Sequence, residues 1–113
     1  ALLEMARGLD YRRVICAFQP HTYSRTKGLF DQFVQELGRA DVVLLAEIFA
    51  ARETNTAGVS SRDLARKLPG AVYCPTLDAV ADRLRALARP GDLILTVGAG
   101  DIYTVGEALA ADA

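Results

Sequence analysis

A cationic stretch near the start of the chain is the part of the sequence best suited to bind an anion. No acidic residue occurs between Asp10 and Asp31, whereas His21, Arg25 and Lys27 fall within that interval. An anion at the start of a helix here would meet backbone N–H groups, the helix dipole, a guanidinium fork and an imidazole. The same charges could instead form a solvated helix face, and His21, which follows a proline, could be an ordinary turn residue.

Two acids and a glycine-rich turn are further candidates. Glu47 and Glu53 could hold Mg²⁺ or position an amine. Their spacing fits no metal motif, so surface acids are the simpler interpretation and we expect no metal ligands. Gly98 and Gly100 could cradle a phosphate, but the third glycine of a dinucleotide fingerprint is missing and Asp101 would repel the anion. The simpler interpretation is a tight turn with Asp101 as a helix N-cap.

The sequence contains no other specific catalytic motif. It lacks a GxxxxGK[ST] loop, so it cannot by itself clamp a nucleoside triphosphate in the P-loop manner, and it lacks a Gly-x-Ser-x-Gly elbow. Cys16 and Cys74 lie in apolar, strand-like segments. A disulfide between them is possible, but buried free thiols are the simpler interpretation.

Apolar periodicity predicts the elements that position these residues. Ser60 or Ser61 can cap one helix, and Thr76 or Asp78 can open the next. The patterns predict strands at 13–18, 41–49, 71–74 and 92–97, and helices at 1–9, 24–37, 60–68, 76–89 and 101–109. Such alternation predicts right-handed crossovers, a mainly parallel sheet and helices on both faces, which is a three-layer α/β sandwich. The uncapped helical pattern at 1–9 also suggests a domain excised from a longer chain.

Function is expected in the segments that follow the strands, because ligands of parallel α/β sheets bind at the carboxyl ends of the strands. These segments are 19–25, 47–58, 75–76 and 98–103.

Length and composition limit the class of protein. The 113 residues, 51% of them hydrophobic, suit one globular domain spanning 1–113 and exclude a disordered tail. Thirteen basic and fourteen acidic residues argue against a bulk nucleic-acid binder. The longest apolar run, 42–46, is far too short to span a bilayer, so no membrane association is expected.

Four segments resemble one known family. The run 18–26, Phe-Gln-Pro-His-Thr-Tyr-Ser-Arg-Thr, closely resembles the segment that opens the C-terminal domain of the Mur ligases. Segments 47–53, 58–61 and 97–103 resemble that domain in matching order and spacing. The resemblance covers nearly the whole chain and implies a Rossmann-like fold.

The resemblance also implies an activity, that of the family member that joins L-alanine to UDP-N-acetylmuramate in the cytoplasm. That enzyme uses ATP and Mg²⁺ for peptidoglycan synthesis, and hence for cell division and cell shape. Its N-terminal and central domains would be missing here, so the chain alone should be inactive and bind no cofactor. Arg25 and His21 match catalytic positions, and the residues matching substrate-binding positions are Tyr23, Ser24, Glu47, Glu53, Gly98, Gly100 and Asp101.

Three positions depart from the family pattern. Thr22 stands where many relatives have Arg, and Glu47 and Phe49 stand where Asp and Tyr are usual. A second cationic contact at position 22 is therefore in doubt. The alternative to a ligase domain is a free-standing α/β module that binds a small anion or a partner without catalysis.

Overall fold

Four parallel strands form the central layer of the computed structural model, which describes residues 11–98 and 101–111. The expected helix at 1–9 and the candidate Gly100 lie outside the described residues. The strands are β1 (Arg13–Gln19), β2 (Val42–Ala46), β3 (Val72–Cys74) and β4 (Asp92–Gly98), in the order β3-β2-β1-β4. The predicted parallel sheet is confirmed, and β4 runs one residue further than expected, to Gly98.

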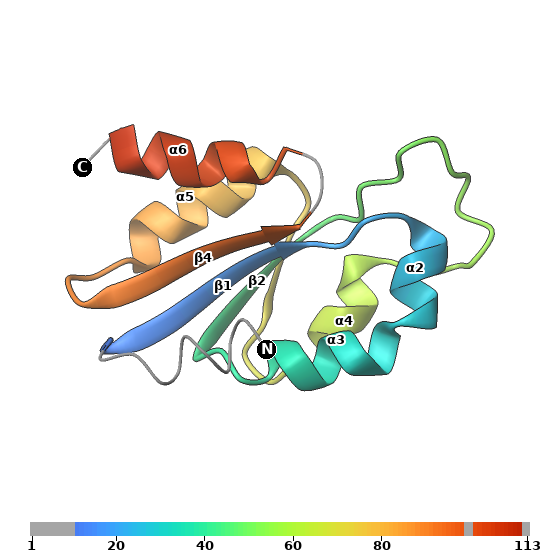
Figure 1. The fold of residues 1–113 in the computed structure, drawn as a ribbon, viewed down its shortest axis with the longest axis horizontal. Coiled ribbons are helices and arrows are strands. Elements are labelled where there is room, and N and C mark those ends of the chain that lie inside the picture. The colour runs from blue at the N-terminus through green and yellow to red at the C-terminus, as the bar shows by residue number, and fades with distance from the viewer. Residues whose placement is uncertain (1–10, 99–100, 112–113) are drawn as a thin grey trace.

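Helices cover both faces of this sheet, as Figure 1 shows. The described helices are α2 (Tyr23–Gly28), α3 (Phe30–Leu37), α4 (Ser61–Lys67), α5 (Leu77–Leu87) and α6 (Tyr103–Ala111). α3 and α4 pack against one face, and α5 and α6 pack against the other. The predicted three-layer α/β sandwich is therefore confirmed. Within the described part of the chain, no helix is long and apolar enough to cross a membrane.

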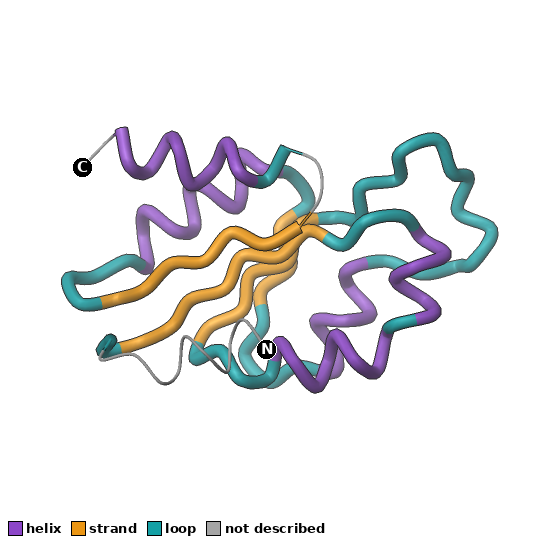
Figure 2. The backbone as a smooth tube through the Cα atoms, in the orientation of Figure 1, coloured by secondary structure: helices purple, strands orange, loops and turns teal. Residues whose placement is uncertain are grey.

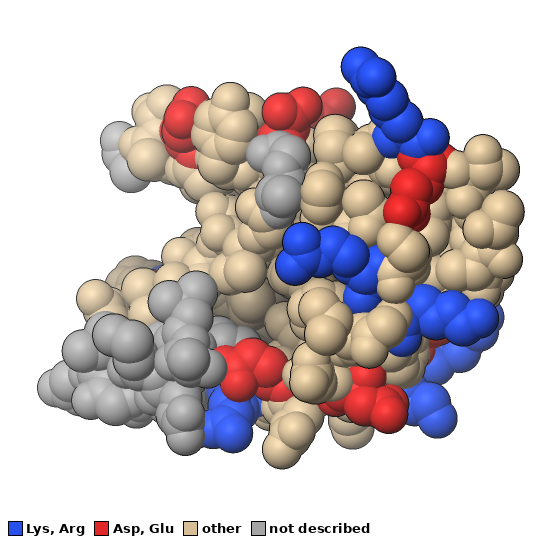
Figure 3. Space-filling model, turned by 45° about the vertical axis from the view of Figure 1, so that its right-hand side comes forward, with Lys and Arg blue, Asp and Glu red and all other residues tan. Residues whose placement is uncertain are grey.

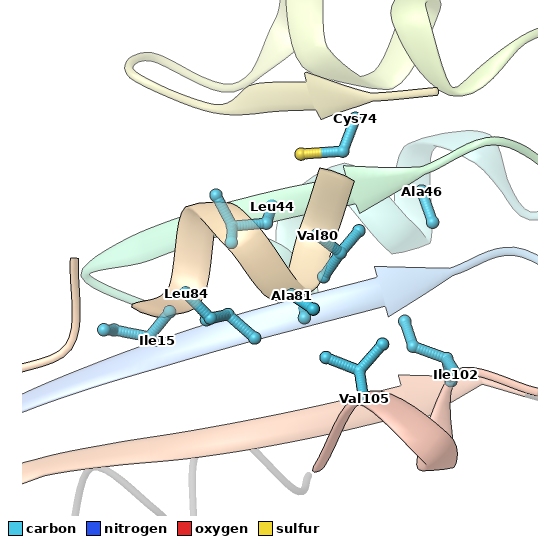
Figure 4. Close-up of a cluster of buried hydrophobic side chains, with 10 residues drawn as sticks. Ile15, Leu44, Ala46, Cys74, Val80, Ala81, Leu84, Ile102 and Val105 are labelled. Atoms are coloured by element: carbon cyan, nitrogen blue, oxygen red, sulfur yellow. The ribbon is translucent and has the colours of Figure 1, made fainter. Parts of the chain in front are cut away.

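The core lies in two halves on either side of β1 and β2. Val14, Cys16 and Phe18 of β1 point to the α3–α4 side, whereas Ile15 and Ala17 point to the α5–α6 side. Figure 4 shows how helical side chains meet the sheet on the second side: Val80, Ala81, Leu84 and Val105 face Ile15, Leu44 and Ala46. Burial on both faces explains why these strands are continuous apolar runs rather than alternating ones.

Both cysteines are free and buried, which confirms the thiol interpretation. Burial, together with the charge of Glu36, raises the pKa of Cys16 to about 12. A thiol with that pKa is protonated at neutral pH and is a poor nucleophile. Cys16 therefore acts as a packing residue of the hydrophobic core.

The crossovers place a crevice between the ends of β1 and β4. The chain leaves β1 toward α2 on one face and leaves β4 toward α6 on the other, which Figure 2 makes visible. β1 and β4 pair along their whole length, from Arg13 beside Asp92 to Gln19 beside Gly98. In open parallel sheets, ligands bind where adjacent strands send their helices to opposite faces.

The opposite end of the same strand pair is closed by an ion pair. The Arg13 guanidinium donates to both carboxylate oxygens of Asp92, at 3.1 and 2.7 Å, and to the carbonyl oxygen of Leu87 at 2.8 Å. The Asp92 carboxylate is almost fully buried and also accepts from the Arg89 N–H. The hydrogen bonds from Arg13 lower the pKa of Asp92 below its ordinary value despite burial.

The prediction of one helix over 24–37 is wrong. Two helices occupy this region, separated at Leu29, whose φ of −110° and ψ of 15° leave the helical region. The Leu29 N–H donates to the Arg25 carbonyl and ends α2, while its own carbonyl accepts from the Phe33 N–H and starts α3. Gly28 favours a break here, since glycine is unfavourable inside a helix.

The expected start of the last helix at Asp101 is also wrong, because Asp101 and Ile102 form a turn and α6 begins at Tyr103. Among the predicted caps, Thr76 is the N-cap of α5 and Ser60 is the N-cap of α4. Ser60 forms a capping box with Asp63. β2 ends at Ala46 rather than at Phe49.

Candidate functional site

The structure brings His21 and Arg25 together at the carboxyl ends of β1 and β4. Both line a hollow of about 200 Å³. The complete lining consists of Phe18, Gln19, His21, Arg25, Phe33 and Gly98. Three of the predicted site residues (His21, Arg25 and Gly98) therefore share one hollow at the crevice where ligands of this architecture bind.

His21 is held by a bridge between the segments that follow β1 and β2. The Phe49 N–H donates to the Pro20 carbonyl and the Thr22 N–H donates to the Phe49 carbonyl, both at 2.8 Å. The His21 and Phe49 rings stack, with centroids 5.7 Å apart and planes 14° apart. This stacking holds the plane of the His21 imidazole. Phe49, which supplies the second ring, stands where the family usually has Tyr.

Thr22 supports Arg25 locally. Its hydroxyl accepts from the Arg25 N–H at 3.4 Å, and its carbonyl accepts from the Thr26 hydroxyl at 2.7 Å. Thr22 has a φ of 61°, a conformation that β-branched residues rarely adopt. Such strained residues concentrate at functional sites, where surrounding contacts hold them in place.

Glu53 occupies the N-terminus of α2. One carboxylate oxygen accepts from the N–H groups of Tyr23 and Ser24, at 2.8 and 3.1 Å, and the other accepts from the Ser24 hydroxyl at 2.5 Å. These hydrogen bonds, led by that of the Ser24 hydroxyl, lower the pKa of Glu53. A carboxylate of the chain therefore already accepts from the N–H groups that the sequence offered to an anion.

Glu47 joins the end of β2 to the start of α4. Its carboxylate accepts hydrogen bonds of 2.7 to 3.2 Å from the hydroxyls of Ser60 and Tyr73 and the N–H groups of Ile48 and Ser61. Burial raises the pKa of Glu47, but these hydrogen bonds together outweigh burial, so the pKa lies below its ordinary value.

Asp101 and Lys27 do not line the hollow, whereas Gly98 does. Asp101 is exposed in the turn before α6. Lys27 is turned toward the 50–59 loop, where its amine donates to the Ala57 carbonyl at 3.4 Å. Gly98 has a φ of 144°, and a Cβ there would overlap the backbone carbonyl of Gln19. Position 98 therefore requires glycine, since this close approach leaves no space for a side chain.

Gln19 is the residue that sequence reasoning missed. It is the last residue of β1, only 9% exposed, and it lines the hollow. Its amide nitrogen donates to the Glu47 carbonyl at 3.2 Å, whereas its amide oxygen has no hydrogen-bond partner. A polar residue directly after the apolar run 14–18 was the available signal.

Figure 3 turns the carboxyl ends of the strands toward the viewer. Basic and acidic side chains of the described residues are interspersed over the face that this view shows. Across residues 11–98 and 101–111, no three His, Cys, Asp or Glu side chains gather as a metal-binding group. Any anion at the hollow would therefore bind to a few specific groups.

A comparison with known protein families identifies the family to which this chain belongs. A model of the family described as "Mur ligase, glutamate ligase domain" matches residues 1–100. The chain belongs to the Mur ligases. The resemblance carried by segments 18–26, 47–53, 58–61 and 97–103 is thereby confirmed. These segments contain the lining residues of the hollow except Phe33, and they contain the His21–Phe49 bridge beside it.

Several curated relatives of this Mur ligase chain are named UDP-N-acetylmuramate–L-alanine ligase. The protein of that name from Acetivibrio thermocellus is 44% identical over 95% of this chain. Those from Lachnospira eligens and Syntrophotalea carbinolica are each 48% identical, over 96% and 88% of this chain. The chain spans about a quarter of the length of these relatives (24%, 25% and 23%).

Proposed function

We propose that residues 1–113 form the C-terminal domain of a cytoplasmic UDP-N-acetylmuramate–L-alanine ligase and supply part of its amino-acid site. The observation that carries the proposal is the shared hollow of His21 and Arg25 at the β1–β4 crevice. The names of the relatives at 42–48% identity support the choice of substrate. The product would enter peptidoglycan synthesis, which underlies cell shape and cell division.

In this proposal the carboxylate of L-alanine binds at Arg25. A guanidinium can donate two parallel hydrogen bonds to a carboxylate, a geometry that lysine cannot match. His21 lines the same hollow and can donate a further hydrogen bond from a ring held by Phe49. The amino group of the bound alanine, after losing a proton, would then attack the carboxyl carbon of the muramyl acyl phosphate, so that the C–N bond of the amide forms and inorganic phosphate leaves.

The chain's own residues do not fit ATP or Mg²⁺. Its sequence has no P-loop, and the carboxylates of Glu47 and Glu53 accept hydrogen bonds that close strand ends and helix starts. Activation of the muramyl carboxylate by ATP therefore belongs to the N-terminal and central domains of the complete ligase. A GxxGK[ST] motif encoded upstream in the same reading frame would support this division of roles over a free-standing anion-binding module.

The proposal predicts a kinetic effect of Arg25→Ala in the complete ligase. Loss of one charge-assisted contact in a transition state costs about 100-fold in rate, so kcat/KM for L-alanine should fall by about that factor. The melting temperature should hardly change, since exposed charges contribute little to stability. Steady-state kinetics with varied L-alanine measures the effect.

Arg39→Ala is the matched control. Arg39 follows α3 and pairs with Glu36 at 3.3 Å, and it does not line the hollow. Its replacement should leave kcat/KM unchanged. Near-normal kinetics for both variants would mean that Arg25 is a solvated surface charge and would overturn the proposal.

The proposal also predicts that the 113-residue chain alone neither hydrolyses ATP nor forms the alanine amide, because it lacks a P-loop. A phosphate-release assay with all substrates checks this expectation. Turnover well above the buffer rate would contradict the assignment as one domain of a larger enzyme.

A further inference from the structure

One end of the Gln19 side-chain amide forms a hydrogen bond and the other end does not. The nearest partner of the amide is the Glu47 carbonyl, which can only accept, so the group at 3.2 Å from it must be the NH₂. The carbonyl end of the amide therefore points elsewhere. Among the buried side-chain nitrogen and oxygen atoms of the described residues, this oxygen is the one without a hydrogen-bond partner.

Leaving such an atom unpaired is costly. A buried acceptor without a donor loses its hydration with no compensation, and native proteins keep very few such atoms. At a ligand site, an unpaired acceptor marks the place where a donor from the ligand belongs. The oxygen belongs to a residue that lines the same hollow as His21 and Arg25.

Strand alternation places this side chain across the crevice from Arg25. Phe18 packs toward α3, so the next residue along β1, Gln19, directs its side chain to the α5–α6 side. Arg25 lies in α2, on the side to which the chain turns after β1. A ligand lying across the crevice would contact the guanidinium with one end and the amide oxygen with the other.

We propose that the Gln19 side-chain oxygen accepts a hydrogen bond from the α-amino group of the amino acid whose carboxylate binds at Arg25 and His21. An amide oxygen can only accept, so carboxylate and phosphate ligands are excluded at this position and an amine is favoured. This inference rests on the proposed function and adds the recognition of the nucleophile to it.

A neutral acceptor suits an amine that must react. The amine has to lose a proton before its lone pair can attack, and a carboxylate beside it would stabilise the unreactive ammonium form. A glutamine oxygen can accept one N–H while leaving the lone pair directed at the carbon under attack. In this proposal Gln19 orients the amine of the amino acid and does not exchange a proton with it.

Gln19→Met in the complete ligase tests the proposal, because methionine matches the length and removes the acceptor. The KM for L-alanine should rise about tenfold or more, the usual effect of losing a hydrogen bond to a charged or reacting group. The KM values for ATP and for UDP-N-acetylmuramate should stay the same. Propionate, which keeps the carboxylate of alanine and lacks its amine, should inhibit wild type and variant with equal Ki.

The propionate comparison separates direct contact from general damage. If Gln19 only supports the fold, KM for L-alanine and Ki for propionate must rise together, and that result would overturn the proposal. An unchanged KM for L-alanine would overturn it as well. Gln35→Met, on the exposed surface of α3, is the matched control and should change neither constant.

Gln19→Glu decides the matter if the methionine variant fails to fold. It keeps an acceptor oxygen and adds a charge, which attracts the amine of alanine and repels propionate. The ratio of the propionate Ki to the alanine KM should therefore rise, and an unchanged ratio would contradict the proposal. Absence of alanine-dependent phosphate release in the wild-type ligase would instead refute the proposed function itself, so the two failures are distinguishable.

Discussion

At the scale of single residues, the two acids after β2 connect strand ends to helix starts. Glu53 accepts hydrogen bonds from the first N–H groups of α2 and Glu47 from the Ser61 N–H at the start of α4, each with both carboxylate oxygens engaged. Carboxylates suit this position because the helix N-terminus carries a partial positive charge and unpaired N–H groups. Their substrate-binding role stays a prediction, whereas their contacts explain why an acid is needed at each position.

Replacing Glu47 by glutamine should lower the free energy of unfolding by about 1–2 kcal/mol, because an NH₂ group then faces N–H or hydroxyl donors that the carboxylate satisfied. Urea denaturation measures the change. Glu107→Gln, on the exposed side of α6, is the control and should shift the midpoint very little. Equal stability of the two variants would show that Ser60, Ser61 and Tyr73 find other partners.

Sequence reasoning anticipated part of the site and none of this capping. His21 and Arg25 stand out because they lie in an interval without acids, and strand-end rules place them correctly. The contacts of Glu47 and Glu53 could not be read from the sequence, because the atoms they reach, apart from the adjacent Ile48 N–H, are 13 to 30 positions away. Gln19 was missed for a similar reason, since an unpaired oxygen is a property of packing.

At the scale of elements, long apolar patterns were predictable and their interruptions were not. Four strands and the helices between them follow from periodicity, because parallel strands are apolar throughout and helices are apolar on one side. The break at Leu29 escaped notice because Phe30, Phe33 and Val34 continue the apolar pattern of one helix. The break leaves α2 as a separate six-residue helix that carries Arg25.

Gly98 sets how closely β4 approaches β1 at the hollow. Gly98→Ala should lower the free energy of unfolding by at least about 2 kcal/mol, since the new methyl group meets the Gln19 backbone and the conformation itself is strained. Gly58→Ala is a matched control: its φ is also positive, but open space surrounds it, so only about 1 kcal/mol should be lost. Chemical denaturation of both variants measures the two losses, because Gly98→Ala introduces a steric clash as well as backbone strain and Gly58→Ala introduces backbone strain alone. Equal losses of unfolding free energy would argue against the close approach of β4 to β1.

At the scale of the whole molecule, three acids with lowered pKa values make stability depend on pH. Asp92, Glu47 and Glu53 have folded-state pKa values below those of the unfolded chain, about 3.9 for Asp and 4.3 for Glu. The unfolded state therefore binds more protons in this range, and stability is fully present above pH 5 and falls as pH drops through the folded-state values. Urea unfolding at pH 7, 5 and 3.5 should show little change at first and then a loss.

Asp92→Asn tests how much Asp92 contributes to the loss of stability at low pH. The variant should be less stable at pH 7, because Arg13 loses its charged partner, and its stability should fall less steeply below pH 5. A wild-type stability that stays flat down to pH 3.5 would contradict the assignment.

The two halves of the core share β1 and β2, so they should unfold together. We expect the 113-residue chain to unfold in one cooperative transition with a free energy of about 3–8 kcal/mol. Far-ultraviolet circular dichroism and tyrosine fluorescence should give coincident curves. A broad or probe-dependent transition would show that other domains complete the core.

The pairing of β1 with β4 also has a consequence for synthesis on the ribosome. Residues 13–19 are made before their partners at 92–98, and Arg13 must wait 79 positions for Asp92. Pairings so distant along the chain slow folding, and until β4 arrives one edge of β1 has exposed hydrogen-bonding groups that can recruit other strands. Since Gly98 lies on β4, the hollow can form only after residues 92–98 have left the exit tunnel, and premature termination before residue 92 would yield an aggregation-prone fragment without the hollow.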